Sequence, residues 1–303
     1  MIAELAAQLH FTQARLRDPL WQTMRSLAYE RYGLVELRAR AYQEVGAHLE
    51  VVFPNYPVFH RLSLASKAVL TTDPEPQRIA AMDLDDFVAE TRLSYEGARL
   101  SKSTLRRIHQ AAQQSWGLGA RAAGSKVRLE LAIQRQRFVA GQIAGLDRQL
   151  LHLYDQTGYA GIAETMSGMT SITAAMLLAL IGDPVEFDSG RCFAKLAGIN
   201  ARENESGEFK GSRSITRRGN PVLRTIAFRG AVSLAKNNPD FNARLAHLMH
   251  RRSNPLTRRQ AHVALANKML RILHVMWVNK EDYDSGIATG SKLPTLLNKS
   301  VTG

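Results

Sequence analysis

Apolar residues recur at helical spacing over most of this chain, and the longest such pattern covers residues 19–53. Asp18 stands immediately before it, where a short acidic side chain can cap a helix, and Pro19 suits the first helical turn. Pro54 and Pro57 end the pattern, because proline has no amide hydrogen to donate within a helix. The pattern therefore predicts one long amphipathic helix.

A second long helix is predicted over residues 125–156. Its apolar residues mostly lie three, four or seven positions apart and form the stripe Leu131, Phe138, Ile143, Leu146, Leu150 and Leu153. Between the long helices, residues 54–82 are predicted to be a connector, Asp83 to cap a short helix, and a further helix to lie near 101–116. We expect an antiparallel, coiled-coil-like arm over residues 19–156, with the stripe packed between its helices. Dimerisation through the same stripe is the alternative.

The rest of the chain predicts a second helical domain over residues 157–283. No run of alternating apolar and polar residues indicates a large sheet, although one short β-hairpin is possible around 207–216. Residues 284–303 are predicted to be a flexible tail, and residues 1–18 a linker or remnant. The expected fold class is mainly α.

Charge narrows the choice of partner. The chain has 40 Lys and Arg residues against 27 Asp and Glu, a formal net charge of +13 and a pI of about 10.2. Such an excess favours a polyanionic partner, above all nucleic acid, over an enzyme with a basic surface or a protein of the membrane surface.

The composition also excludes several classes of protein. The single cysteine, Cys192, cannot form a disulfide framework or a cysteine-based zinc site, and it indicates a reducing, cytoplasmic location. The N-terminal segment carries Glu4 and lacks the apolar core of a signal peptide. The longest apolar run, Ile172 to Gly182, is shorter than the roughly 20 residues that span a bilayer. We therefore expect no membrane partner.

Three segments carry candidate chemistry. The first, ETMSGMTSITAA at residues 164–175, resembles a helix-hairpin-helix element, in which a glycine turn brings the backbone close to a phosphate. Gly168 occupies the first glycine position, and Thr170 stands where a second glycine is usual. The alternative is an ordinary pair of helices that makes no contact with DNA.

The second segment, residues 198–224, combines glycines, hydroxyls and cations in a polar loop that enters an apolar helix. Asn220 can cap this helix, with Pro221 in its first turn. Ser206, followed by Gly207, is accessible in such a loop and is the candidate nucleophile, although a Ser-Gly pair is most often only a turn. The cations that can stabilise phosphoryl charge or bind nucleic acid are Lys210, Arg213, Arg217 and Arg218.

The third segment, residues 241–280, contains no Asp or Glu. Its candidate nucleic-acid-binding residues are Arg251, Arg252, Arg258, Arg259 and Lys268. The four arginines flank a predicted turn at 253–257, and each cation that neutralises a phosphate adds salt-sensitive affinity. A solvated basic face is the alternative. His262 and His274 have apolar neighbours and are interpreted as packing residues, so no metal site is nominated.

The combined order of these segments resembles the transposases of the insertion-sequence 110 family, also named for insertion sequences 116 and 902. The residues that carry the resemblance are MSGMTSITAAMLLALIGDPVEF, FAKLAGINARENESGEFKGSRSITRRGNPVLRTIAFRGA and ALANKMLRIL, together with the looser match ERYGLVELRARAYQEVGAHLEVVFP. The resemblance covers residues 160–283 most closely and implies a C-terminal transposase domain preceded by a helical connector.

In the family that this chain resembles, an RNase H-like N-terminal domain holds Mg²⁺ with four acidic residues. A serine of the C-terminal domain attacks DNA, the active site is shared between subunits, and a structured RNA guides recombination. The resemblance places that serine at Ser206. It also implies DNA, a guide RNA and a second copy of the chain as partners.

The family's four carboxylates would lie upstream of Met1, and Asp83, Asp85 and Asp86 match none of them. The resemblance therefore predicts a truncated or internally initiated transposase that contains no cofactor of its own and has lost activity by itself. A non-catalytic helix-hairpin-helix protein that binds or regulates nucleic acid is the second hypothesis. An interaction protein that oligomerises through its long helices is the third.

Overall fold

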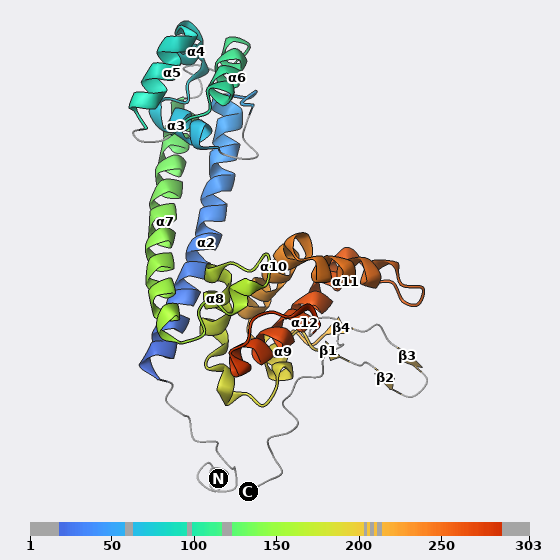
Figure 1. Ribbon diagram of the computed structural model, residues 1–303. Coiled ribbons are helices and arrows are strands. Elements are labelled where there is room, and N and C mark those ends of the chain that lie inside the picture. The colour runs from blue at the N-terminus through green and yellow to red at the C-terminus, as the bar shows by residue number, and fades with distance from the viewer. Residues whose placement is uncertain are drawn as a thin grey trace, which may run out of the picture. The chain divides into compact units, whose positions relative to one another are not determined.

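The computed structural model describes residues 18–57, 63–95, 99–116, 123–202, 205–206, 209–210 and 214–286, with backbone pairing alone for the strand residues 201–214. These residues are mainly α-helical, as predicted (Figure 1). The helices are α2 (Pro19–Val52), α3 (Leu64–Thr72), α4 (Pro76–Ala81), α5 (Leu84–Leu93), α6 (Lys102–Gln113), α7 (Ala123–Gln156), α8 (Ser171–Ile181), α9 (Gly190–Ala197), α10 (Pro221–Asn237), α11 (Pro239–His250) and α12 (Arg258–Asn279). Two 3₁₀ turns, η3 (Ala163–Thr165) and η4 (Pro184–Glu186), flank α8.

The chain forms two compact units, whose boundaries fall inside the two long helices. Unit 1 contains residues up to Glu30 and from Leu146 onward, and unit 2 contains Arg31–Gly145. Since a continuous helix shows no change of composition at such a boundary, the sequence pattern gives no sign of it. The predicted boundaries, at 18/19 and 156/157, remain predictions.

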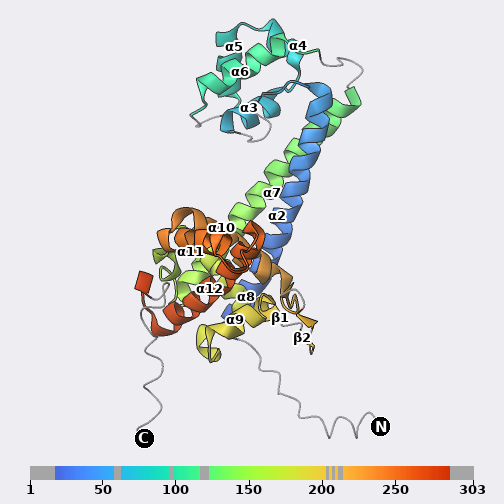
Figure 2. The ribbon, with the colours of Figure 1, turned by 90° about the vertical axis from the view of Figure 1, so that its right-hand side faces the viewer.

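In unit 2, the second half of α2 lies antiparallel to the first half of α7 (Figures 1 and 2). Glu44 of α2 and Arg135 of α7 form an ion pair between the two helices, with 2.9 Å between the charged atoms. Their shared core contains Val45, Leu49, Leu129, Ala132 and Ile133.

Asp18 caps α2 as predicted, since its carboxylate accepts a hydrogen bond from the amide of Leu20 at 2.7 Å.

The predicted stripe of α7 is partly wrong. Ile143 and Leu150 are buried, whereas the side chains of Leu131 and Phe138 are 51% and 67% exposed. Phe138 and Ile143 are five residues apart, about 140° around a helix with 3.6 residues per turn, so Leu131 and Phe138 lie on a different face of α7 from Ile143 and Leu150. The face of α7 that is buried in unit 2 carries Leu129 and Ile133 instead.

The segment predicted to be a connector, residues 54–82, contains the short helices α3 and α4, so that prediction is wrong in part. Ser63 caps α3 by accepting a hydrogen bond from the amide of Ser66, and Pro76 begins α4. Helices of nine and six residues are too short to give a clear period. Tertiary packing stabilises them, because α3 contacts α5 and α6, and α4 contacts α6.

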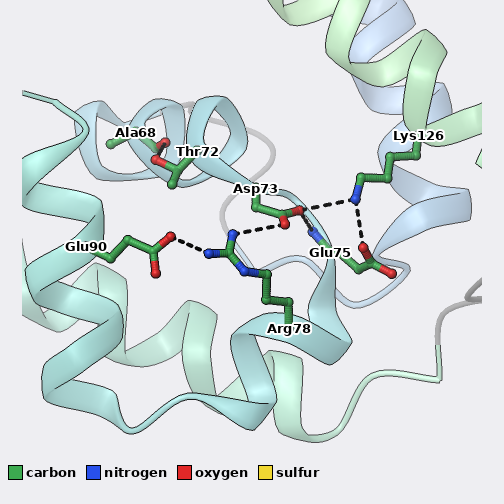
Figure 3. A network of polar contacts seen from close by, with 7 residues as sticks. All are labelled: Ala68, Thr72, Asp73, Glu75, Arg78, Glu90 and Lys126. Carbon is green, nitrogen blue, oxygen red and sulfur yellow. Dashed lines mark hydrogen bonds and ion pairs between the residues drawn. The ribbon is translucent and has the colours of Figure 1, made fainter.

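A network of ion pairs holds this helical cluster to α7 (Figure 3). Lys126 lies 2.7 Å from the Glu75 carboxylate and 3.7 Å from that of Asp73. Arg78 binds Asp73 at 3.1 Å and Glu90 at 2.6 Å. The contact with Glu75 raises the pKa of Lys126, and the contacts with Asp73 and Glu90 raise the pKa of Arg78. The network thus joins α4, α5 and the start of α7.

In unit 1, α12 packs against α9, α10 and α11 (Figure 2). Its buried Trp277 and Met269 reach the core, and Phe193 of α9 packs against the Trp277 ring. His274 is buried, and its Nε2 is hydrogen-bonded to the carbonyl of Phe187, which agrees with the prediction that it is a packing residue. A membrane span is ruled out for every helix in the described part of the chain, because none is both long and apolar enough.

Candidate nucleic-acid interface

Residues 201–215 pair their backbones in two short antiparallel ladders. The paired residues are Ala201–Ile215 and Arg202–Ser214 in β1 and β4, and Glu205–Lys210 and Ser206–Phe209 in β2 and β3. The predicted hairpin therefore exists, but it begins earlier than residue 207. Ser206 is the last residue of β2, and only two residues separate it from β3.

Glycines allow the two ends of this hairpin to meet at its base. The amide of Asn220 donates to the Leu196 carbonyl at 2.7 Å, and the amide of Arg217 donates to the Gly198 carbonyl at 3.0 Å. A Cβ atom on Gly219 would lie 2.4 Å from the Leu196 oxygen, so only glycine fits between these backbones. The base of the Ser206 hairpin is therefore fixed against the end of α9.

Two arginines at this base remain available for a partner. Arg217 and Arg218 are exposed, and neither forms an ion pair with any residue that the structure describes. Arg224, by contrast, is used internally, since its Nη1 donates to the Ala197 carbonyl at 3.0 Å. Arg213 lies outside the described residues, and the Ser206 and Lys210 positions are described by their backbone pairing only.

Asn220 connects the hairpin base to two helices. As predicted, its Oδ1 caps α10, accepting hydrogen bonds from the amides of Val222 at 3.0 Å and Leu223 at 3.2 Å. Its Nδ2 donates to the hydroxyl oxygen of Tyr29, on α2, at 2.8 Å. Both bonds lie inside unit 1, so one side chain fixes where the hairpin ends and α10 begins.

Replacing Asn220 with alanine is expected to destabilise the protein by about 1–2 kcal/mol, the cost of losing an N-cap. Asn220→Asp keeps the capping oxygen and loses only the donor to Tyr29, so it is the matched control. Thermal unfolding of the three proteins measures both contributions. If Asn220→Asp were as unstable as Asn220→Ala, the capping bonds would not be the source of the effect.

The candidate helix-hairpin-helix turn has a packing role of its own. Gly168 has a φ of +99°, and its carbonyl accepts a hydrogen bond from the Ser233 hydroxyl at 2.8 Å. A Cβ atom at Gly168 would lie 3.0 Å from Asn237, so the close approach that this glycine allows is to α10. Thr170 is exposed and caps α8 through the amide of Thr173. The element directly before Gly168 is the 3₁₀ turn η3 and not an α-helix, and the helix-hairpin-helix assignment remains a hypothesis.

The structure does not bring the glycine turn and the hairpin base together. Gly168 contacts Ser233 near the end of α10, whereas the hairpin base meets Asn220 at its start. These positions are 13 residues apart in one helix, or about 20 Å along its axis. A partner that contacts both must therefore extend along unit 1.

Four of the nominated arginines lie at the junction of α11 and α12: Arg251 and Arg252 in the turn, and Arg258 and Arg259 in the first turn of α12. Arg252, Arg258 and Arg259 are exposed and form no ion pair with the described residues. Arg251 differs, because its Nε donates to the Asn254 carbonyl at 2.7 Å and so shapes the turn. Thr257 then begins α12 with a capping box to Gln260. Three of the four arginines at this junction are therefore exposed to solvent.

Lys268, farther along α12, has cationic neighbours that the sequence prediction did not nominate. Burial lowers the pKa of Lys268, and the guanidinium groups of Arg244 and Arg271 lower it further. The Asp240 carboxylate acts in the opposite direction. Arg244 comes from α11, and only the packing of α11 on α12 places it near Lys268. The acid-free stretch 241–280 contains all three cations, and Lys268 and Arg271 are three residues apart, but neither feature of the sequence shows that Arg244 lies near them.

The described residues contain no group of three or more His, Cys, Asp or Glu side chains that could hold a metal ion. Besides Asp240, which accepts from Tyr283, two carboxylates of unit 1 accept hydrogen bonds from tyrosine hydroxyls. Tyr159 donates to Asp183 at 2.8 Å, and Tyr154 donates to Glu164 at 3.2 Å. Burial, followed by these carboxylates, raises the pKa of both tyrosines.

Comparison with known proteins gives a consistent result. Residues 160–246 match the Transposase IS116/IS110/IS902 family. The chain is 32% identical over 155 residues to the transposase-like protein y4pF/y4sB of Sinorhizobium fredii, over 50% of this chain and 39% of that protein. It is 32% identical over 152 residues to the "Probable family 20 transposase" of Pseudomonas aeruginosa, over 48% of this chain and 43% of the relative.

A third relative, the transposase for insertion sequence element IS1111A of Coxiella burnetii, is 32% identical over 127 residues. This match covers 41% of the chain and 34% of the relative. The chain therefore spans less than half the length of the curated relatives that it matches.

Proposed function

We propose that this chain binds DNA and takes part in DNA transposition, because residues 160–246 match the Transposase IS116/IS110/IS902 family and about half of the chain is 32% identical to transposases. The observation that carries this proposal is the exposed basic surface of unit 1. Arginines at the hairpin base and at the turn before α12 face solvent without ion pairs among the described residues. Exposed cations that form no ion pair within the described residues are available to bind phosphates.

We further propose that Ser206 is the nucleophile. Its hydroxyl oxygen attacks the phosphorus of a DNA phosphodiester, a new Ser206–phosphate ester forms, and the bond from phosphorus to the leaving deoxyribose oxygen breaks. The leaving oxygen takes up a proton and becomes a free DNA end. The hairpin base supports this role, since it holds Arg217 and Arg218 within the same loop as Ser206, where they can stabilise phosphoryl charge.

The family resemblance extends the proposal to Mg²⁺, a structured guide RNA and a second copy of the chain. A magnesium ion would stabilise the attacking and leaving oxygens of the transfer. The described residues do not supply a set of ligands that fits this ion. For the guide RNA, the same basic surface of unit 1 is the proposed contact.

The proposal predicts that the chain binds duplex DNA with strong salt dependence. Each neutralised phosphate is expected to contribute about −0.9 to the slope of log K against log salt. Fluorescence anisotropy with a labelled 20-base-pair duplex at several salt concentrations measures this slope. A binding constant that does not change with salt would contradict the electrostatic account.

A further inference from the structure

We propose that Arg244, Lys268 and Arg271 form one binding site for a backbone phosphate of duplex DNA, on the face of α12 next to the Ser206 hairpin. The site rests on the proposed function, because it assumes that DNA is the partner. It goes further by identifying a place on unit 1 where a phosphate is held by converging cations.

The geometry begins with α12. Lys268 and Arg271 are three residues apart, so their side chains leave the helix on the same side. Helix α9 packs along one flank of α12, where Gly190 lies so close to the Arg271 backbone that a Cβ atom would be 2.6 Å from its Cα. Helix α11 packs against α12 as well and contributes Arg244. Three cations from two helices therefore share one region.

The charge balance of this region is unusual. Arg244 and Arg271 are exposed, Lys268 is half-buried, and none of the three forms an ion pair with a described residue. Among the described residues, the acid that acts on Lys268 is Asp240, whose carboxylate accepts a hydrogen bond from the Tyr283 hydroxyl at 2.8 Å. The three cations repel one another, and the carboxylate of Asp240 is shared with the Tyr283 hydroxyl. This arrangement favours the binding of an anion.

The position of the cluster suits a phosphate of DNA. Asn267, one turn of α12 before Arg271, donates from its side chain to the carbonyl of Ile199 at 3.4 Å. Ile199 leads into β1 and so into the hairpin that carries Ser206. Because residues four apart share one side of a helix, Arg271 lies one turn beyond Asn267 on the side of α12 that carries the contact with Ile199. A phosphate held there would fix the register of DNA relative to Ser206, as backbone contacts generally do.

The first experiment neutralises the site in the full chain. Arg244→Gln, Lys268→Gln and Arg271→Gln together keep most of each side chain and remove three charges. Binding to a 20-base-pair DNA duplex is expected to fall at least about tenfold, and the salt slope to decrease in magnitude by about one to two. The matched control removes three exposed cations of unit 2, Arg92, Arg99 and Arg106, and is expected to change binding less than threefold.

A variant that is expected to strengthen DNA binding distinguishes this site from a general loss of structure. Asp240→Asn removes the negative charge beside Lys268 and keeps an oxygen that can accept from Tyr283. It is expected to tighten DNA binding about two- to fivefold, which no unfolding effect would do. Unchanged or weaker binding by this variant would count against the site.

A direct measurement follows Lys268 itself. NMR of the protein with ¹³C-methylated lysines gives the pKa of each amine, and that of Lys268 is expected to be below the usual lysine value and to rise when DNA is added. Inorganic pyrophosphate and an RNA duplex of equal length serve as comparison probes. A pKa rise with RNA but not with DNA would overturn the assignment to DNA.

The outcomes distinguish this inference from the proposed function. If the unaltered chain bound no DNA, the proposed function itself would fail. If the unaltered chain bound DNA with a steep salt dependence, and the triple glutamine variant bound equally well, only the α12 site would be wrong.

Discussion

Reversing three arginines of the α11–α12 turn, with Arg252→Glu, Arg258→Glu and Arg259→Glu, is expected to weaken DNA binding by about a hundredfold or more. The three side chains are exposed and form no ion pairs with described residues, so each is available to a phosphate. Each substitution removes an attraction and adds a repulsion of the phosphate backbone. Arg251 is left in place, because its Nε holds the turn through the Asn254 carbonyl.

The fold is expected to survive this change. Arg258 and Arg259 occupy the first turn of α12, where acidic side chains interact favourably with the positive end of the helix dipole. Arg252 lies in an exposed turn, and substitutions at such surface positions seldom change stability by more than about 0.5 kcal/mol. Circular dichroism and thermal unfolding check this expectation.

The control carries the same charge change on unit 2, at Arg92, Arg99 and Arg106. It is expected to weaken binding only a few-fold, through the change in net charge. Equal losses in both variants would mean that total charge, not the turn, governs binding. Native stability with undiminished DNA binding in the turn variant would show that the turn is only a solvated basic face.

The second large effect concerns Ser206. If Ser206 forms the proposed ester with DNA, Ser206→Ala is expected to abolish the covalent adduct, a reduction of about a thousandfold or more, because alanine has no nucleophilic oxygen. DNA binding is expected to change less than twofold, since only one hydroxyl is lost. Ser214→Ala, in β4 of the same hairpin, is the matched control and is expected to retain the adduct.

The assay combines this chain with a full-length transposase of the family and with DNA from the ends of its element. Adducts that resist detergent are separated by the mass of each chain, and mass spectrometry locates the modified residue. Absence of any adduct on the unaltered chain would contradict the proposed mechanism. An adduct that persists in Ser206→Ala, or that maps to another serine, would remove Ser206 from it.

Local features of the fold were predictable from the sequence. Asp18, Asp83 and Asn220 cap the helices that follow them, as expected, because a cap depends on amides only two or three residues away. The mainly helical fold followed from the dominant 3.6-residue period. The same argument failed for α3 and α4, since helices this short are stabilised by their neighbours in unit 2 and not by their own sequence.

The candidate site was predictable in its parts but not in its arrangement. The excess of cations, the acid-free stretch 241–280 and the hairpin region can be read from the sequence alone. The sequence could not show that Gly168 and Asn220 lie at opposite ends of α10. It also could not show that Arg251 serves the turn while Arg252 faces solvent, because that depends on the path of the backbone.

The sequence by itself therefore determined the helices with their caps and the basic character of the chain, because each depends on composition or on residues close together along it. Tertiary structure decided which face of α7 is buried, leaving Leu131 and Phe138 exposed. It also brought Arg244 of α11 to Lys268 of α12. Those residues are 24 positions apart in sequence, and only the packing of two helices gives them a common surface.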